Sequence, residues 1–261
     1  MRLSLLLFLF ALALGCGTPE RSTGDEGTVS SSGSTDSATD SVVLHPIYHG
    51  SLVLEQGGRT IFVDPHDGAE RYTAYGAPDL VLITHTHGDH LDSATLSGID
   101  LTQATLIAPQ AVMDAISNKT FADMHTMGNG DDWTWQDIEV SAIPAYNPPP
   151  KENFHPEGQF NGYVLEFTGP GERIYISGDT EGVPAMRGLD DIDVAFVCMN
   201  LPYTMDIEQA ADAVAEFAPA VVYPYHYRNQ DGTKSDVAAF ARMVSEADGA
   251  IEVRQAEWYT E

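Results

Sequence analysis

Residues 84–92, Thr84-His85-Thr86-His87-Gly88-Asp89-His90-Leu91-Asp92, directly follow the aliphatic run Leu80-Val81-Leu82-Ile83. That run is long enough for a strand covered on both faces and too short for an ordinary helix. In open α/β sheets, ligands bind in the crevice beyond the carboxyl ends of the strands. The stretch therefore predicts an α/β fold and places a functional site just after this strand.

Three imidazoles and two carboxylates stand within these nine residues. A single histidine is more often a satisfied polar residue, but so many groups that compete for protons pack unfavourably without a ligand. Imidazole nitrogen and carboxylate oxygen together suit zinc, manganese or iron. The only cysteines are Cys16 and Cys198, so a structural thiolate site is excluded. We expect a metal site here.

Short apolar runs bounded by Gly, Pro and Asp fill the rest of the chain from about Val42 onward. Antiparallel strands are expected at 43–48, 51–56 and 60–63, with Gly57-Gly58 as a hairpin turn. Further strands are expected at 105–108, 138–143, 162–167, 173–177, 194–198, 221–223 and 251–254, and helices at 91–98, 109–117, 207–217 and 234–246. This order predicts two packed sheets with helices outside.

The motif His85-x-His87-x-Asp89-His90 resembles the HxHxDH signature of the metallo-β-lactamase superfamily. Three further segments are similar to that family in order and spacing: Phe62-Val63-Asp64-Pro65, Ser177-Gly178-Asp179-Thr180 and Tyr225-His226. The resemblance covers residues 42–261. It implies a single domain with the α/β fold of an αββα sandwich.

The resemblance also implies a ligand set for two metal ions, expected to be zinc, with manganese or iron as alternatives. One ion would be bound by His85 and His87, and the other by Asp89, His90 and His226, with Asp179 between them. Asp64 would support the site from behind. Two such ions lower the pKa of a shared water and polarise the bond under attack. Asp89 would also act in catalysis, by orienting the hydroxide or by accepting its proton.

One position departs from the family. Where the family places a further histidine for the first metal, this chain has Asn147. An amide oxygen is a weaker ligand than imidazole, so either Asn147 binds the metal weakly or a nearby group replaces it. His155, in the proline-rich loop after Asn147, is the candidate replacement, although a surface histidine is the equal alternative. His49 follows the first strand and is expected near the cleft.

The segment around Asn147, together with Tyr203-Thr204-Met205, resembles the branch that contains lactonases and phospholipase-type hydrolases. Antibiotic hydrolysis is less expected than cleavage of a lactone, ester or phosphodiester. Two other functions stay open: a di-iron redox enzyme, and a metal-binding or scaffold protein that has lost activity through its altered ligands. The small-molecule substrate and the oligomeric state are not defined by these motifs.

The formal net charge is −27, with 39 acidic and 12 basic residues. Such a surface repels phosphate backbones, because no excess of Lys or Arg exists to displace their counterions. We expect no nucleic-acid partner, and a solvated acidic surface that keeps the protein soluble.

The N-terminus is typical of an exported lipoprotein. Residues 1–15 resemble a signal peptide, and Leu12-Ala13-Leu14-Gly15-Cys16 resembles a lipobox in which Cys16 is lipidated. Residues 16–41 are rich in Ser, Thr and Gly and are expected to be a disordered linker. Gly17 favours the outer membrane, so the only expected membrane contact is a lipid anchor in the bacterial cell envelope. Cys198 lies in an apolar run and is expected to be a core residue.

Overall fold

The computed structural model of the chain describes residues 41–117, 120–168 and 171–259, which form two mixed β-sheets. The predicted signal peptide, Cys16 and the linker up to residue 40 lie outside the described residues. One sheet has the strand order β1-β2-β3-β4-β5-β6, and the other has the order β13-β12-β11-β10-β9-β8-β7.

The first sheet begins with the expected antiparallel meander. Gly57 and Gly58 adopt positive φ values of 60° and 81° in the turn between β2 and β3, which explains glycine at both positions. From β3 onward neighbouring strands are parallel. The strands are β1 (Val43–Tyr48), β2 (Ser51–Gln56), β3 (Arg59–Val63), β4 (Leu80–Leu82), β5 (Thr105–Ala108) and β6 (Asp123–Thr126).

The second sheet is antiparallel from β7 to β10 and parallel from β10 to β13. Its strands are β7 (Asp132–Trp135), β8 (Ile138–Ala145), β9 (Phe160–Phe167), β10 (Arg173–Ile176), β11 (Val194–Cys198), β12 (Val221–Tyr225) and β13 (Glu252–Val253). Cys198, at the end of β11, is a fully buried free thiol, as expected.

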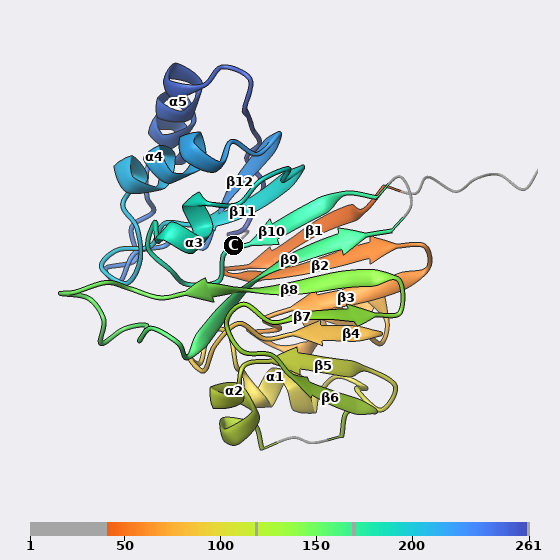
Figure 1. The fold of residues 1–261 in the computed structure, drawn as a ribbon. Helices are drawn as coiled ribbons and strands as arrows, with labels where there is room; N and C mark the ends of the chain where they lie inside the picture. Colours follow the sequence, from red (N-terminus) through yellow and green to blue (C-terminus); the bar gives the residue numbers. More distant parts are fainter. Residues whose placement is uncertain (1–40, 118–119, 169–170, 260–261) are drawn as a thin grey trace, which may run out of the picture. The chain divides into compact units, whose positions relative to one another are not determined.

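Alternate residues of the first sheet belong to two different cores. In β4, Leu80 and Leu82 belong to the core shared with the second sheet, whereas Val81 belongs to a separate core that includes Leu96 and Val112 from the helices. All three β4 residues are fully buried, so the prediction of a strand covered on both faces is confirmed. The fold is the expected αββα sandwich, with helices flanking the packed sheets (Figure 1).

The helices cover the outer faces. The 3₁₀ helix η1 (Ala69–Tyr75) and the helices α1 (Ser93–Ser97) and α2 (Gln110–Ala115) pack on the first sheet. The helices α3 (Pro184–Arg187), α4 (Ile207–Phe217) and α5 (Val237–Ala247) pack on the second. Tyr175 of β10, for example, contacts Phe217 of α4 edge-to-face at 5.9 Å between ring centroids.

Several predicted bounds were wrong. Two of the predicted helices are shorter, because Asp92 caps the first turn of α1 and Gly98 ends it, while α2 ends at Ala115. Helix α5 starts at Val237 rather than at residue 234, since Lys234 pairs with Arg228 in a β-bridge and Asp236 caps the helix. Strands β6 and β7 were missed because each has only four residues and lies at a sheet edge.

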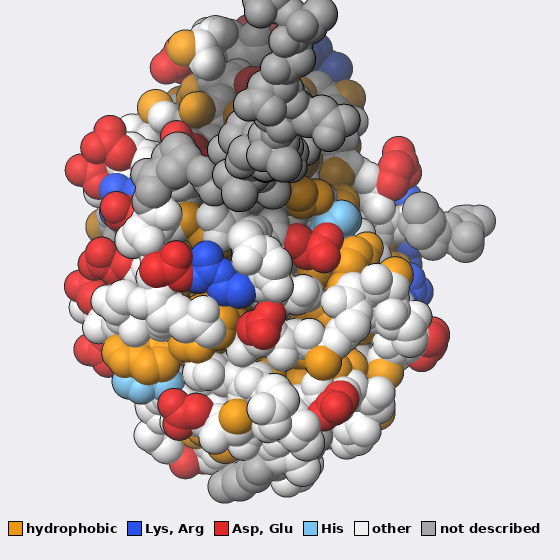
Figure 2. Space-filling model, turned by 90° about the vertical axis from the view of Figure 1, so that its right-hand side faces the viewer, with side chains coloured by type: hydrophobic (Ala, Val, Ile, Leu, Met, Phe, Trp, Pro, Cys, Tyr) orange, Lys and Arg blue, Asp and Glu red, His pale blue; other side chains and the backbone are white. Residues whose placement is uncertain are grey.

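Acidic side chains are spread over the visible face of the molecule rather than gathered in one patch (Figure 2). This distribution agrees with a solvated acidic surface. Within the described part of the chain, no helix is both long and apolar enough to cross a bilayer.

Candidate metal centre

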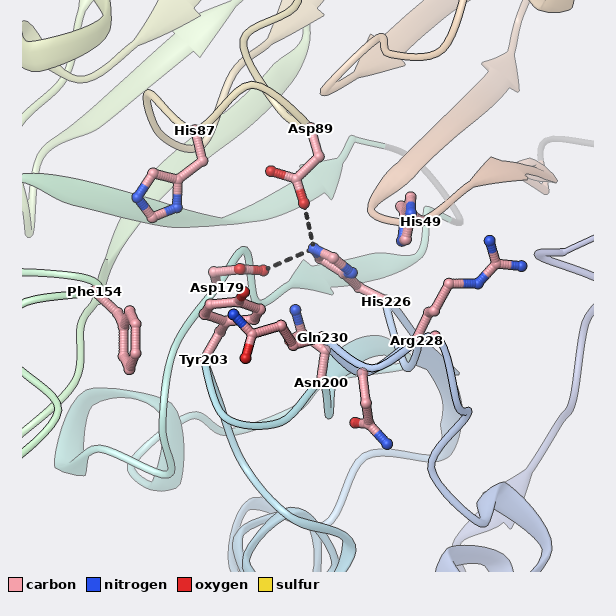
Figure 3. A pocket seen from close by; sticks show the side chains of 12 residues that line it. His49, His87, Asp89, Phe154, Asp179, Asn200, Tyr203, His226, Arg228 and Gln230 are labelled. Carbon is pink, nitrogen blue, oxygen red and sulfur yellow. Dashed lines mark ion pairs between the residues drawn. The ribbon is translucent and has the colours of Figure 1, made fainter.

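The side chains predicted as ligands converge at one edge of the two sheets. His85, His87, Asp89 and His90 follow β4 of the first sheet, while Asp179 follows β10 and His226 follows β12 of the second. Several of them border a cavity of about 480 Å³ (Figure 3). The site therefore lies beyond the carboxyl ends of parallel strands, as expected.

The first ligand group consists of His85, His87, His155 and one oxygen of Asp179. The Nε2 atom of His85 lies 3.1 Å from Nδ1 of His87 and 4.0 Å from Oδ2 of Asp179. The Nε2 atom of His155 lies 3.4 Å from the same Asp179 oxygen. His155, fully buried, is thus part of the cluster and not a surface residue.

The second group consists of Asp89, His90 and His226. The Nε2 atom of His226 lies 3.1 Å from Nε2 of His90 and 3.3 Å from Oδ2 of Asp89. Oδ1 of Asp179 lies 3.5 Å from the Nε2 atoms of both His90 and His226. Asp179 therefore presents one oxygen to each group.

Both groups fit a metal ion. Two ligand atoms bound at 2.0–2.1 Å to one tetrahedral zinc lie about 3.3 Å apart, which agrees with most of these separations. Nε2 of His155 and Oδ1 of Asp179 are buried and have no hydrogen-bond partner. Such orphaned polar atoms are costly unless a ligand satisfies them, and each points toward one of the two groups.

Asp64, directly after β3, forms hydrogen bonds to the segment 84–90, which carries four of the ligands. Its Oδ2 atom lies 2.7 Å from Nδ1 of His90 and accepts a hydrogen bond from the Thr84 hydroxyl at 2.7 Å. Its other oxygen accepts the Thr84 backbone N–H at 2.8 Å. With Nδ1 of His90 donating to Asp64, Nε2 is the nitrogen that would bind a metal after losing its proton.

Asn147 orients the ring of His155, as Asp64 orients the ring of His90. Oδ1 of Asn147 lies 2.9 Å from Nδ1 of His155, and the Asn147 backbone N–H donates to the His155 carbonyl at 2.9 Å. The Asn147 amide also donates to the Tyr203 carbonyl at 2.6 Å. Asn147 thus faces the ring of His155 rather than the ligand groups, and it directs Nε2 of His155 into the first group.

The backbone at His226 and His49 is unusual. Both residues have positive φ, 46° at His226 and 49° at His49, and the His226 N–H donates to the His49 carbonyl at 3.1 Å. Gly50 follows, and a Cβ added there would lie 2.8 Å from Cε1 of His90. The positive φ of His49 and the close approach of Gly50 to His90 place the turn between β1 and β2 directly against the second ligand group.

Burial raises the pKa of the Asp89 and Asp179 carboxyls, but His90 and His226 beside them outweigh burial, and the pKa of both is lowered. Burial and the neighbouring His90 lower the pKa of His85 well below its usual range. Burial also opposes the charged form of His90, yet the carboxylates of Asp179, Asp64 and Asp89 raise its pKa to about 10. At neutral pH the carboxylates of Asp89 and Asp179 and the imidazole of His85 are therefore in metal-binding form, and His90 would release a proton when a metal binds.

The other histidines lie outside both groups. His45 lies 2.7 Å from Glu55, His66 lies 3.4 Å from Asp92, and His125 stacks on Trp133. His49 borders the cavity, and burial and His226 lower its pKa to about 3. The sequence analysis missed Gly50, Phe154 and Arg228, which the fold brings to the site. Arg228 stands two residues after His226, and this spacing was an available signal.

The αββα sandwich and the paired histidine–carboxylate groups define a protein of the metallo-β-lactamase fold. Residues 44–226 match the family model of the beta-lactamase superfamily domain. The chain belongs to this superfamily.

Several relatives of this chain are named as metal-dependent hydrolases. A UPF0173 metal-dependent hydrolase from Anoxybacillus flavithermus is 30% identical over 76% of this chain and 92% of its own length. The chain is also similar to a crystal structure from Parabacteroides distasonis named as a metal-dependent hydrolase, with a TM-score of 0.72, 36% identity, and 84% and 94% of the two chains covered. A metallo hydrolase from Ignicoccus hospitalis has a TM-score of 0.69 at 26% identity, with 82% and 94% covered.

Proposed function

We propose that this protein hydrolyses a lactone, ester or phosphodiester with two divalent metal ions held in the two ligand groups. The observation that supports this function best is the position of Asp179. Its two oxygens face different groups, at 3.4 Å from Nε2 of His155 and 3.5 Å from Nε2 of His226. A carboxylate placed in this way would be shared by two ions, which would supply the activated water of hydrolytic two-metal sites.

His85, His87 and His155 would hold one ion, and Asp89, His90 and His226 the other, with Asp179 shared. Bound ions of this kind supply a water of lowered pKa and polarise the scissile bond. In hydrolysis, hydroxide adds to the acyl carbon or phosphorus, the bond to the leaving oxygen breaks, and that oxygen receives a proton.

Asp89 is placed to handle the proton. Its side chain is 39% exposed, whereas those of His90 and Asp179 are buried, so Asp89 faces the cavity (Figure 3). Its pKa is lowered by His90 and His226 in spite of burial, so the carboxylate is ionised at neutral pH. A carboxylate in this position orients a water or accepts its proton.

The test uses the purified full chain, supplied with zinc or manganese, against lactone, ester, phosphodiester and β-lactam panels. We expect one to two equivalents of metal and hydrolysis that chelation abolishes and added metal restores. Asp179→Ala should lose both metal and turnover. A metal-loaded chain that cleaves nothing and consumes oxygen with bound iron would favour a redox enzyme. A metal-loaded chain that does neither would favour a binding protein.

We also propose that the protein is exported and held in the outer membrane through a lipid on Cys16. The support is the sequence of residues 1–41, which lie outside the described residues. Cys16→Ser in the full chain should move the protein from the membrane fraction to the soluble fraction with unchanged metal content. A wild-type protein that is already soluble would contradict the lipid anchor.

A further inference from the structure

Arg228 lies at one end of the cavity that contains the metal centre. It lines the cavity together with His87, Asp89 and Asp179, while Phe154 lies at the opposite end (Figure 3). Its position is set by the loop after β12, in which Arg228 pairs with Lys234 in a β-bridge. A substrate bound at the metal centre would therefore extend toward Arg228 on one side and toward an aromatic surface on the other.

The guanidinium of Arg228 is held in place by two tyrosines. Its Cζ atom lies 4.4 Å from the ring centroid of Tyr259 and 5.7 Å from that of Tyr48. Its Nη1 atom donates to the Tyr48 hydroxyl at 2.9 Å, and its backbone N–H donates to the Tyr259 hydroxyl at 3.1 Å. A guanidinium fixed in this way loses little conformational entropy when it binds a ligand.

Among the described residues, Arg228 is also a cation without a carboxylate partner, in a strongly acidic chain. Six other basic side chains of the described residues form ion pairs: Arg59 with Asp137, Arg71 with Asp67, Lys151 with Glu181, Arg173 with Glu166, Arg187 with Glu216 and Arg254 with Glu252. Arg228 forms no such pair within the described part of the chain, and its Nε atom is buried without a hydrogen-bond partner.

Other cations without such a pair differ from Arg228 in their surroundings. Arg242 and Lys234 are exposed to solvent, which stabilises their charge. Lys234 pairs with Arg228 in the β-bridge, and its Nζ lies 5.1 Å from the Tyr259 ring centroid, so it adds positive charge beside Arg228. The charge of Arg228 is partly buried and has no carboxylate partner among the described residues. An anion that binds there would therefore replace hydration that Arg228 has lost.

We propose that Arg228 binds an anionic group of the substrate, a carboxylate or a phosphate, that is separate from the scissile bond. The remainder of the substrate would contact Phe154 and Tyr203, whose rings meet edge-to-face at 5.2 Å between centroids. This assignment rests on the proposed hydrolytic function, because bound metal ions must offset the charge of Asp89 and Asp179 before an anion can enter the cavity.

The test compares two esters that differ only in one charge, mono-(4-nitrophenyl) glutarate and its methyl ester. The wild-type full chain should prefer the anionic ester in kcat/KM by about tenfold or more. In Arg228→Gln the preference should fall to about one, and Arg228→Lys should retain part of it, since lysine keeps the charge but not the forked geometry. Arg242→Gln removes an arginine outside the cavity and should leave rate and preference unchanged.

Calorimetric titration with glutarate and with inorganic phosphate gives a readout that does not depend on turnover. Arg228→Gln should weaken binding of at least one of the two anions about tenfold or more, and the anion affected identifies the carboxylate or the phosphate. Wild type and Arg228→Gln with the same ester preference and anion affinity would overturn the assignment of Arg228 while hydrolysis stands. If the metal-loaded wild type cleaves neither ester, the proposed hydrolysis of esters fails, and anion binding alone decides about Arg228.

Discussion

His155 and Asn147 form a pair joined by two hydrogen bonds, at the place where the sequence departs from its family. The imidazole of His155 reaches the first ligand group, and the amide of Asn147 fixes the tautomer and orientation of that ring. His155 therefore supplies the imidazole that the family resemblance placed at position 147. An oriented neutral imidazole is a stronger ligand for zinc than an amide oxygen.

His155→Ala should reduce metal content and turnover together, because it removes a nitrogen ligand from the first group. Asn147→Ala should weaken metal affinity less, by about 10- to 100-fold, as is usual when the partner of a metal-bound histidine is removed. Asn147→Asp keeps an acceptor for Nδ1 of His155 and should stay closest to wild type. Elemental analysis after dialysis against graded chelator measures all three.

The matched control for these variants is His125→Ala, since His125 stacks on Trp133 away from the ligand groups. It should bind metal as the wild type does. Equal metal content in His155→Ala, Asn147→Ala and wild type would reject His155 as a ligand.

Gly50 is a second residue on which the centre depends. In Gly50→Ala the new Cβ would lie 2.8 Å from Cε1 and 3.3 Å from Nδ1 of His90, so the ring or the backbone at residue 50 must shift. Metal affinity should fall about tenfold or more, because the hydrogen bond that orients His90 is disturbed. In Gly249→Ala, the control, the added Cβ meets only the Ser245 carbonyl oxygen at 3.7 Å. Equal metal affinity in both variants would contradict this account.

Among the elements, the strands position the ligands and the helices cover the sheets. The strands β4, β10 and β12 each end directly before ligands, so their register sets the positions of His85, Asp179 and His226. Helix α4 contributes buried Ala210, Val214 and Phe217 to the core and supplies no ligand. Its stability should therefore be separable from the metal centre.

Asp206→Ala should lower the free energy of unfolding by about 1 kcal/mol without changing metal content. The Asp206 carboxylate accepts the Gln209 backbone N–H at 2.8 Å at the start of α4, and this hydrogen bond is lost. Asp206→Asn retains a capping oxygen and serves as the control. Chemical denaturation of the metal-loaded chain measures the effect. A loss of metal in Asp206→Ala would show that helix and site are coupled after all.

In the folded domain, the candidate metal centre takes its ligands from both sheets. The ligands after β4 belong to the first sheet, whereas Asp179 and His226 belong to the second, and Asp179 contacts both groups. A ligand that binds only the folded state stabilises it in proportion to the logarithm of its concentration over its dissociation constant. Metal ions held between the sheets should therefore stabilise the whole domain.

Chelation should lower the thermal midpoint of the full chain by roughly 8–16 °C, the shift expected when a ligand bound about a thousandfold above its dissociation constant is removed from a domain of this size. Differential scanning calorimetry with and without chelator, followed by return of zinc or manganese, measures it. Asp179→Ala should show little response to chelator. An unchanged wild-type midpoint after verified metal loss would contradict a role of the metal in joining the sheets.

Much of the fold and the site followed from local sequence. The buried strand β4, the hairpin turn at Gly57-Gly58 and the motif from His85 to His90 are short-range patterns, because strand alternation, turn conformation and ligand spacing depend on neighbouring residues. Asp179 and His226 were predicted through family resemblance, because each lies in a short segment after a predicted strand that is similar to a segment of the family. The edge strands β6 and β7 were not predicted, because each has only four residues and β6 has a single apolar side chain.

The choice between Asn147 and His155 required the three-dimensional structure, as did the positions of Gly50 and Arg228. His155 lies in the connection between β8 and β9, and only the path of that loop brings its ring to His85 and Asp179. Gly50 and Arg228 come from segments about 180 residues apart, which meet because β1 and the loop after β12 lie on the same side of the site. Ligand chemistry is thus encoded in short motifs, whereas which groups share a site depends on long-range packing, because contacts between distant segments form only when the sheets assemble.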